Sequence, residues 1–97
     1  MEVSGGGTGN GTNIQQNTYN GTNAQHFYLL DAGNGYFYLI NMNSGLAVDV
    51  AGGGTNNGDN IQQWALNYSN SQRFRLQSTG DGWYQIINMN SNRAVDV

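Results

Sequence analysis

Charged side chains are few in this 97-residue sequence, and their spacing limits the chemistry open to it. Six carboxylates and three arginines carry the charge, and there is one histidine, with no lysine or cysteine. A glycoside hydrolase would need two carboxylates facing each other across a cleft, roughly 5–10 Å apart. Asp49 and Asp96 instead stand 47 residues apart in identical Ala-Val-Asp-Val contexts. The sequence also lacks the residues needed for a nucleophilic triad or a multi-histidine zinc site. We therefore expect no enzyme activity, no metal site and no cofactor.

Neutral polar side chains are far more numerous than charged ones. Sixteen Asn and eight Gln residues can each donate and accept hydrogen bonds, which suits neutral, polyhydroxylated ligands such as sugars. The net charge of −3 and the lack of a basic stripe argue against nucleic-acid binding. No apolar run has the length of a membrane span, so membrane insertion is not expected, and no basic, apolar leader stands in these residues.

The sequence repeats itself at a fixed offset of 47 residues. Residues 3–50 align without a gap with residues 50–97, and 27 of the 48 positions are identical. Identity at this level is far above chance and indicates two copies of one structural unit. We therefore divide a single domain, residues 1–97, into a first copy at 3–50 and a second copy at 51–97.

The local patterns within each copy predict β-strands and no sustained helix. Aromatic and β-branched runs follow Gly-x-Gly turns, and apolar and polar residues alternate elsewhere. We expect an all-β fold with four short strands per copy. The predicted strands are residues 14–16 and 61–64, 26–29 and 73–76, 36–40 and 83–87, and 47–50 and 94–97. The predicted core consists of Ile14, Phe27, Leu29, Val48, Val50, Ile61, Phe74 and Leu76.

Three short motifs of the second copy together resemble the repeat of ricin-B-type lectins. They are Asp49-Val50, Gln62-Gln63-Trp64 and Gln72-Arg73-Phe74, and the first copy carries the weaker equivalents Gln15-Gln16-Asn17 and Gln25-His26-Phe27. The resemblance covers nearly the whole chain. It implies a β-trefoil, a barrel of three such repeats with one sugar site in each, and hence a non-catalytic lectin or carbohydrate-binding module. It also implies neutral saccharide ligands, of galactoside or xylan type, and an extracellular location.

Carried over to this sequence, the resemblance assigns one complete sugar site to the second copy. Asp49 would accept hydrogen bonds from two adjacent sugar hydroxyls, and Trp64 would stack on the sugar ring. Alternation along the strand supports this role, since Gln62 and Trp64 share the face opposite Ile61. Two structural alternatives stay open: Asp49 fixing a hairpin, and Gln72 satisfying loop backbone. The full set is Asp49, Gln62, Trp64, Asn67, Asn70, Ser71 and Gln72, with Asn70 as the alternative to Ser71.

The equivalent site of the first copy has poorer residues. Asn17 stands at the tryptophan position and cannot stack on a sugar, and Ala24 lacks hydrogen-bonding groups. Tyr19, two residues after Asn17, is the candidate for a ring. The carboxylate would come from Asp96 of a neighbouring copy or be replaced by Glu2. We expect a weak or silent site made of Asp96, Gln15, Asn17, Tyr19, Asn20 and Gln25.

Two repeats do not close a β-trefoil, which requires three. The sequence begins and ends inside a repeat, and residues 4–97 span two lengths of 47 residues. We therefore expect other copies of the chain to complete the barrel. The smallest closed assembly is a homotrimer, whose six repeats make two trefoils, and a dimer is its rival. A different interpretation is a designed or dissected structural trefoil fragment that binds little or no sugar.

Overall fold

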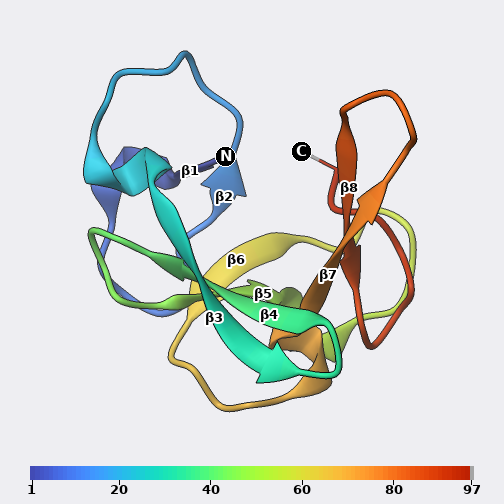
Figure 1. The fold of residues 1–97 in the computed structure, drawn as a ribbon. Coiled ribbons are helices and arrows are strands. Elements are labelled where there is room, and N and C mark those ends of the chain that lie inside the picture. The colour runs from blue at the N-terminus through green and yellow to red at the C-terminus, as the bar shows by residue number, and fades with distance from the viewer. Residues whose placement is uncertain (97) are drawn as a thin grey trace.

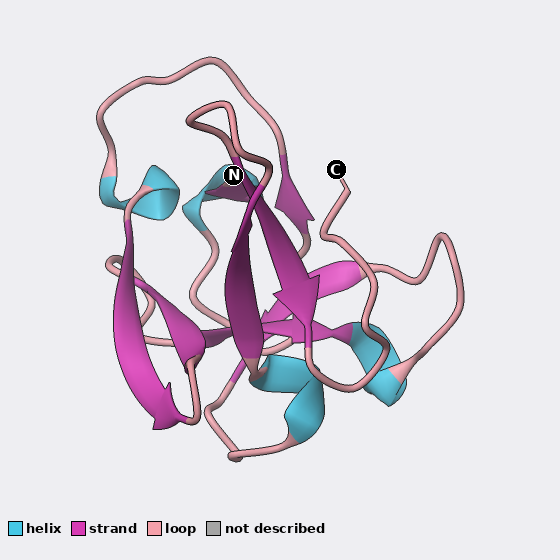
Figure 2. Ribbon diagram, turned by 45° about the vertical axis from the view of Figure 1, so that its right-hand side comes forward, coloured by secondary structure: helices cyan, strands magenta, loops and turns pink. Residues whose placement is uncertain are grey.

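Residues 1–96 of the computed structural model form eight short β-strands and four single-turn 3₁₀ helices (Figure 1). The all-β prediction is confirmed, because helical residues in this part of the chain occur only in three-residue turns (Figure 2). None of these turns is long and apolar enough to cross a membrane. The strands are β1 (Glu2–Val3), β2 (Ile14–Gln15), β3 (Phe27–Gly33), β4 (Tyr36–Asn41), β5 (Ala47–Val50), β6 (Ile61–Trp64), β7 (Phe74–Ser78) and β8 (Tyr84–Asn88). The 3₁₀ turns are η1 (Ser4–Gly6), η2 (Asn23–Gln25), η3 (Ala51–Gly53) and η4 (Asn70–Gln72).

Six of the strands form one antiparallel sheet in the order β6–β5–β4–β7–β8, with β3 also paired to β4. β1 and β2 form a separate two-stranded sheet. The predicted strand at residues 94–97 is only partly present: Ala94 makes an isolated bridge to Ile87, and residues 95 and 96 are not in a strand. Residue 97 lies outside the described residues. The last strand position of the second copy therefore lacks the pairing that its equivalent, β5, has in the middle of the sheet.

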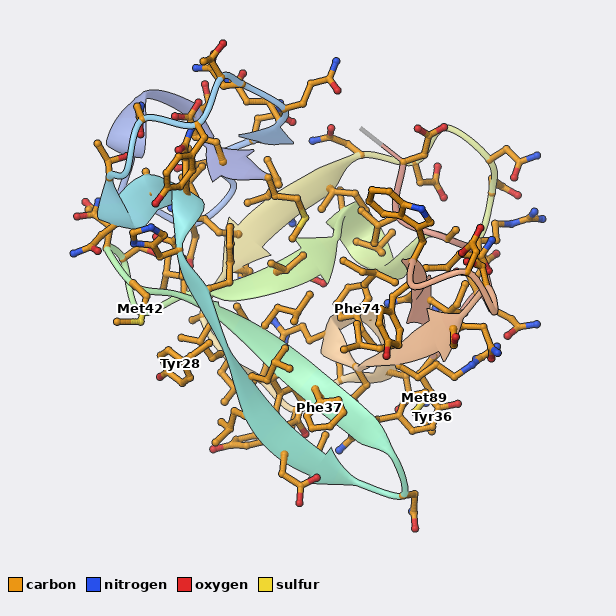
Figure 3. The ribbon with its side chains drawn as sticks, turned by 45° about the horizontal axis from the view of Figure 1, so that its top comes forward. Tyr28, Tyr36, Phe37, Met42, Phe74 and Met89 are labelled. Carbon is orange, nitrogen blue, oxygen red and sulfur yellow. The ribbon has the colours of Figure 1, made fainter. Side chains whose placement is uncertain are left out.

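Two small apolar clusters form the core. Tyr38, Ile40 and Ala47 make one, and Leu39, Val48 and Phe74 make the other, in which Phe74 points into the middle of the molecule (Figure 3). Of the predicted core residues, four are buried and two are half-buried against the second cluster: Ile14, Val48, Val50 and Phe74, then Phe27 and Ile61.

Two residues predicted to lie in the core are exposed. Leu29 is 49% accessible and Leu76 is 42% accessible, so their assignment to the core is wrong. Leu29 belongs to β3, which within residues 1–96 pairs only with β4 and therefore lies at the margin of the cluster. Leu76 lies two residues beyond Phe74, the residue at which β7 pairs with β4. Alternation assigned both leucines to the correct face, but that face is not covered at these two points.

A short glycine turn occurs in both copies, and its left-handed backbone conformation explains why glycine stands there. Gly5 and Gly52 have φ values of 60° and 62°, a left-handed conformation that residues with a Cβ adopt only at a cost. An asparagine from later in each copy then holds the turn. Asn43 Nδ2 donates to the carbonyl of the next glycine at 3.1 Å, and Asn90 makes the same bond in the second copy at 3.0 Å. The internal repeat is therefore present in backbone conformation and hydrogen bonding as well as in sequence.

The side chain of Gln63 joins the two copies. It is fully buried, and its Nε2 donates to the carbonyls of Gly7 and Gly9 at 2.9 and 3.0 Å. Its Oε1 accepts a hydrogen bond from the Ser44 hydroxyl at 2.7 Å. A buried amide with both ends satisfied avoids the desolvation cost of an unpaired polar group. A turn of the first copy is therefore held by a residue 56 positions further along the chain.

Candidate functional site

The pairing of β5 with β6 brings the main candidate residues onto one face. Asp49 lies opposite Gln62, and Ala47 lies opposite Trp64. Directly opposed residues of an antiparallel pair point to the same side, and residues two apart along a strand do so too. Asp49, Gln62 and Trp64 therefore share one face of this strand pair, as alternation along the predicted strand requires.

Asp49 is an unusual carboxylate because it is buried without full pairing. Its side chain is only 7% accessible, and its Oδ1 has no hydrogen-bond partner within residues 1–96. An unpaired buried acceptor costs about 1–3 kcal/mol, and more when it is charged. A hairpin-fixing role would require this oxygen to accept a backbone bond, which it does not. The oxygen remains able to accept a hydrogen bond from an external hydroxyl group.

Trp64 lies at the surface and not in the core. Its side chain is 39% accessible. The turn of the first copy lies beside it, since a Cβ on Gly11 would come within 3.8 Å of Trp64 Cζ3. The backbone N–H of Gly11 fixes this approach by donating to the Gln63 carbonyl at 2.8 Å. Part of the ring is thus held by the neighbouring copy while the rest stays open to solvent.

Gln72 shapes the loop after Trp64. Its side chain is fully buried, with Oε1 accepting from the Asn67 backbone N–H at 2.9 Å and Nε2 donating to the Ala65 carbonyl at 3.0 Å. Gln25 makes the equivalent bonds in the first copy, to the Asn20 N–H at 2.7 Å and the Thr18 carbonyl at 2.8 Å. Both amide ends are occupied by loop backbone, as the structural alternative for Gln72 requires.

The other three candidates differ in what they can still offer a ligand. Asn67 uses its Oδ1 to accept from the Ser69 N–H at 3.0 Å, which leaves its amide nitrogen for donation. Asn70 Oδ1 accepts from Arg73 Nη1 at 2.8 Å. Ser71 is buried, and its hydroxyl lies 2.8 Å from that of Ser69. The loop therefore presents Asn67 more freely than Asn70 or Ser71.

Tyr68 is an exposed aromatic residue of this loop that the sequence reasoning did not select. It has a φ of 61°, where the equivalent residue of the first copy is Gly21 with a φ of 72°. A bulky residue in this conformation is rare and carries a local conformational cost. Its ring packs edge-on against Tyr38, with centroids 5.8 Å apart, and stays largely exposed. The signal was available: an aromatic residue stands where the sister copy has glycine.

In the first copy the carboxylate beside Gln15 is Glu2, and it is satisfied internally. Its Oε2 accepts from Asn17 Nδ2 at 2.8 Å and from Gln15 Nε2 at 3.2 Å, and its Oε1 accepts from Gln25 Nε2 at 3.3 Å. These bonds, that of Asn17 above all, outweigh the effect of burial and lower the pKa of Glu2 below its ordinary value of 4.5. Within one chain Asp96 lies elsewhere, on a groove described below.

The remaining residues of this first-copy site do not supply an aromatic platform beside Glu2. Tyr19 is exposed, and its hydroxyl lies 3.1 Å from His26 Nε2, so the side chain is engaged with His26. Asn20 Oδ1 accepts bonds from the backbone and hydroxyl of Thr22 at 3.0 and 2.7 Å. A polar pocket of about 430 Å³ is left, lined by Glu2, Gln15, Asn17, Asn20 and neighbouring residues. The two equivalent sites therefore differ in both ring and carboxylate.

The sequence matches the family model described as ricin-type β-trefoil lectin domain-like twice, over residues 1–64 and 34–97. The chain belongs to this family. The predicted resemblance to ricin-B-type lectins and the predicted β-trefoil fold are both confirmed, and the lectin-like family supports a carbohydrate-binding fold. No curated protein sequence matches.

Twelve chains of solved structures are similar to this ricin-type lectin domain. One is a designed three-fold symmetric protein, ThreeFoil, with 35% identity, a TM-score of 0.97, and coverage of 99% of this chain and 69% of that chain. Another is 1,3Gal43A, an exo-β-1,3-galactanase from Clostridium thermocellum, with 33% identity, a TM-score of 0.91, and coverage of 95% of this chain and 20% of that chain. The chain thus spans about two thirds of the first protein and a fifth of the second.

Proposed function

We propose that this domain binds neutral saccharides without catalysis, at the face formed by Asp49, Gln62 and Trp64. The observation that carries the proposal is the buried Asp49 carboxylate, whose Oδ1 lacks a partner within residues 1–96 and shares a strand face with a half-exposed indole ring. A buried acceptor of this kind requires a donor. A sugar offers adjacent hydroxyl donors on its rim and an apolar C–H surface on its face.

In this binding mode each residue has a separate task. Asp49 accepts hydrogen bonds from two neighbouring hydroxyls, and the carboxylate charge strengthens those bonds. Trp64 covers the apolar face of the sugar ring. Asn67, with its amide nitrogen available, donates to a further oxygen of the ligand. A shallow site with one ring and one carboxylate gives a dissociation constant on the order of 0.1–1 mM, about 4–5.5 kcal/mol.

The ligand class we propose is a β-galactoside, with xylan-type chains as the second choice. Family membership supports both, and the galactoside is favoured because one similar structure is named as an exo-β-1,3-galactanase. That enzyme contains a region of the same fold amounting to a fifth of its chain, which fits an accessory binding module and supplies no catalytic residue here. We also propose an extracellular location and self-association as a homotrimer, in keeping with the family and with the surface described in the next subsection.

Fluorescence titration tests the function directly. Trp64 reports on its own site once Trp83, which is exposed and outside the site, is replaced in a Trp83→Phe reporter variant. Galactose, β-1,3-galactobiose and xylobiose added to about 10 mM should shift or quench the Trp64 emission with saturation, and glucitol should not. An unchanged spectrum with every saccharide in a folded protein would favour the alternative of a structural trefoil unit that does not bind sugar.

A further inference from the structure

A groove of about 700 Å³ is lined by residues that follow the start of the chain, such as Ile14, and by residues that precede its end, such as Val95. Strands β2 and β8, next to these two segments, lie toward the same side of the molecule as the N-terminus (Figure 1). Its lining includes apolar side chains from both copies, among them Ile14, Val50, Ile61 and Val95. Ile61 and Val95 also pack against the second core cluster. The rest of the lining is mainly polar, with Asn, Gln, Ser, Asp and Arg side chains. The groove therefore combines polar side chains with apolar residues that reach the core.

The sequence Ala-Val-Asp occurs twice, at residues 47–49 inside the sheet and at residues 94–96 on the groove, and the two occurrences differ in burial. Ala47, Val48 and Asp49 are all buried, because β5 lies between β4 and β6 in the sheet. The same Ala-Val-Asp sequence at residues 94–96 leaves Ala94 and Asp96 exposed and Val95 half-buried. Within residues 1–96 this segment pairs only through the bridge from Ala94 to Ile87. The side that β6 covers in the one case is bare in the other.

The first copy shows the complementary gap. β1 is equivalent to β5 but pairs only with β2 among the described strands, so the edge that would meet a strand like β4 is free. Gln63 is fully buried on the glycine turn of the preceding copy, whereas its equivalent, Gln16, is exposed. Free strand edges of this kind are templates for pairing with another chain.

One occupant satisfies all three gaps at once. Residues 94–96 have no strand beside them in the position that β6 takes beside β5, and β1 has none in the position of β4. Gln16 has no glycine turn to bind, as Gln63 does. One copy of the 47-residue unit contains all three of these elements. We infer that the groove is the seat of one unit from a second copy of this chain. The internal contact between the two units of one chain is the template for this interface, since the same residues face each other in the same register.

Three chains close two barrels in this way. The 97 residues hold two units, so one chain that opens between its units gives one of them to each of two neighbours. The opened chain loses its internal pairing of β5 with β6 and regains the same pairing at residues 94–96 of a neighbour. Because the pairing that β6 loses is replaced by an equivalent one, the exchange fills the groove at little cost in that pairing.

The junction also forms a sugar site that no single chain contains, an inference that rests on the function proposed above. A unit seated against residues 94–96 places Asp96 opposite the partner's Gln62 and on one face with the partner's Trp64, as Asp49 is placed within one chain. Asp96 would then become buried in the position where Asp49 is buried now. Of the three Trp64 residues in a trimer, two are paired with Asp49 and one with Asp96.

Light scattering tests the interface with a matched pair of arginine variants. Wild type should have three times the 10.5 kDa chain mass. Ala94→Arg should remain folded, because Ala94 is exposed in one chain, and should be monomeric, because its equivalent, Ala47, has no accessible surface once covered. Met42→Arg, an exposed position away from the groove (Figure 3), should keep the trimer mass. A monomeric or dimeric wild type, or a trimeric Ala94→Arg, would overturn the interface.

Binding stoichiometry tests the junction site separately. In the trimer, Asp96→Asn should remove about a third of the saccharide binding sites and Asp49→Asn about two thirds. The control Asp31→Asn, at an exposed position of β3, should remove none. An unchanged number of sites in trimeric Asp96→Asn would refute the junction site. If wild type binds no saccharide at all, the proposed function has failed, while the masses still decide the interface.

Discussion

The two carboxylates beside the paired strands of each copy have opposite surroundings. Glu2 is directed into its own unit and accepts bonds from Asn17, Gln15 and Gln25, while Asp49 keeps one buried oxygen free. The two surroundings differ because Glu2 has one more methylene group than Asp49 and because Asn17 stands where the second copy has Trp64. Glutamate has the longer reach, and asparagine supplies an amide where the second copy has Trp64. The same strand pairing therefore yields an internal polar network in one copy and an unsatisfied acceptor next to an aromatic ring in the other.

The glutamines that shape the two loops offer the largest contrast in stability. Gln72→Ala would leave the Asn67 N–H and the Ala65 carbonyl without partners in a partly buried setting, and we expect a loss of about 2 kcal/mol of unfolding free energy. Gln25→Ala removes equivalent bonds in a more exposed loop, together with the 3.3 Å bond to Glu2, and should cost less, about 1 kcal/mol. Urea unfolding measures both. Equal losses would mean that burial does not distinguish the loops.

Binding should respond to the second copy alone. Trp64→Ala or Asp49→Ala should weaken saccharide binding at least tenfold, about 1.4 kcal/mol, since each removes one of the two main contacts. The equivalent changes Asn17→Ala and Glu2→Gln should leave binding at the second copy unchanged. Titration calorimetry with a β-galactoside compares the four variants. A comparable loss of binding in the first-copy variants would show that the assignment of the site to the second copy is wrong.

Converting the first copy into the second should create binding. The double change Glu2→Asp and Asn17→Trp withdraws the carboxylate, removes its strongest hydrogen-bond donor and adds a ring. We expect the number of saccharides bound per chain to rise by one, with weaker affinity at the new site because Ala24 adds no hydrogen-bonding side chain. Either single change should add no site. A folded double variant with unchanged stoichiometry would show that more than ring and carboxylate separates the copies.

The smallest effect concerns acid stability. The folded-state pKa of Glu2 lies below its ordinary value of 4.5, so the unfolded chain takes up the proton first as pH falls. The contribution of Glu2 to stability is therefore complete above pH 4.5 and is lost as pH falls through the folded-state pKa. Glu2→Gln lacks this contribution. Urea unfolding at pH 6 and pH 3 should show a gap between wild type and variant that shrinks at the lower pH.

Periodicity and repetition predicted most of the strands, though not the state of residues 94–96. They also predicted the shared face of Asp49, Gln62 and Trp64, because side-chain direction in a strand depends on local sequence alone. The boundaries of the two copies stay a prediction. The exposure of Leu29 and Leu76 was not predictable in this way, since it depends on where a strand stops being covered by its neighbours.

The hydrogen bonding of the two carboxylates, Glu2 and Asp49, could likewise not be predicted from local sequence. The internal network of Glu2 requires Asn17 and Gln25 to converge from a distant strand end and a turn. The free oxygen of Asp49 is the result of a missing partner, and motifs record only the residues that are present. Sequence thus indicated where the candidate sites lie, and tertiary contacts decided which of them is open.

The bond from Gln63 to the first glycine turn also has a consequence for the order of folding. Its two acceptors lie 56 and 54 positions earlier in the chain. Contacts of such long sequence separation require a large loop to close before they can form, and topologies dominated by them fold slowly, on the millisecond to second scale. During synthesis at about 5–20 residues per second, the first turn must wait several seconds until Gln63 is available. The carbonyls of Gly7 and Gly9 lack these bonds during that interval, which is when a glutamine of a neighbouring chain can most readily bind them.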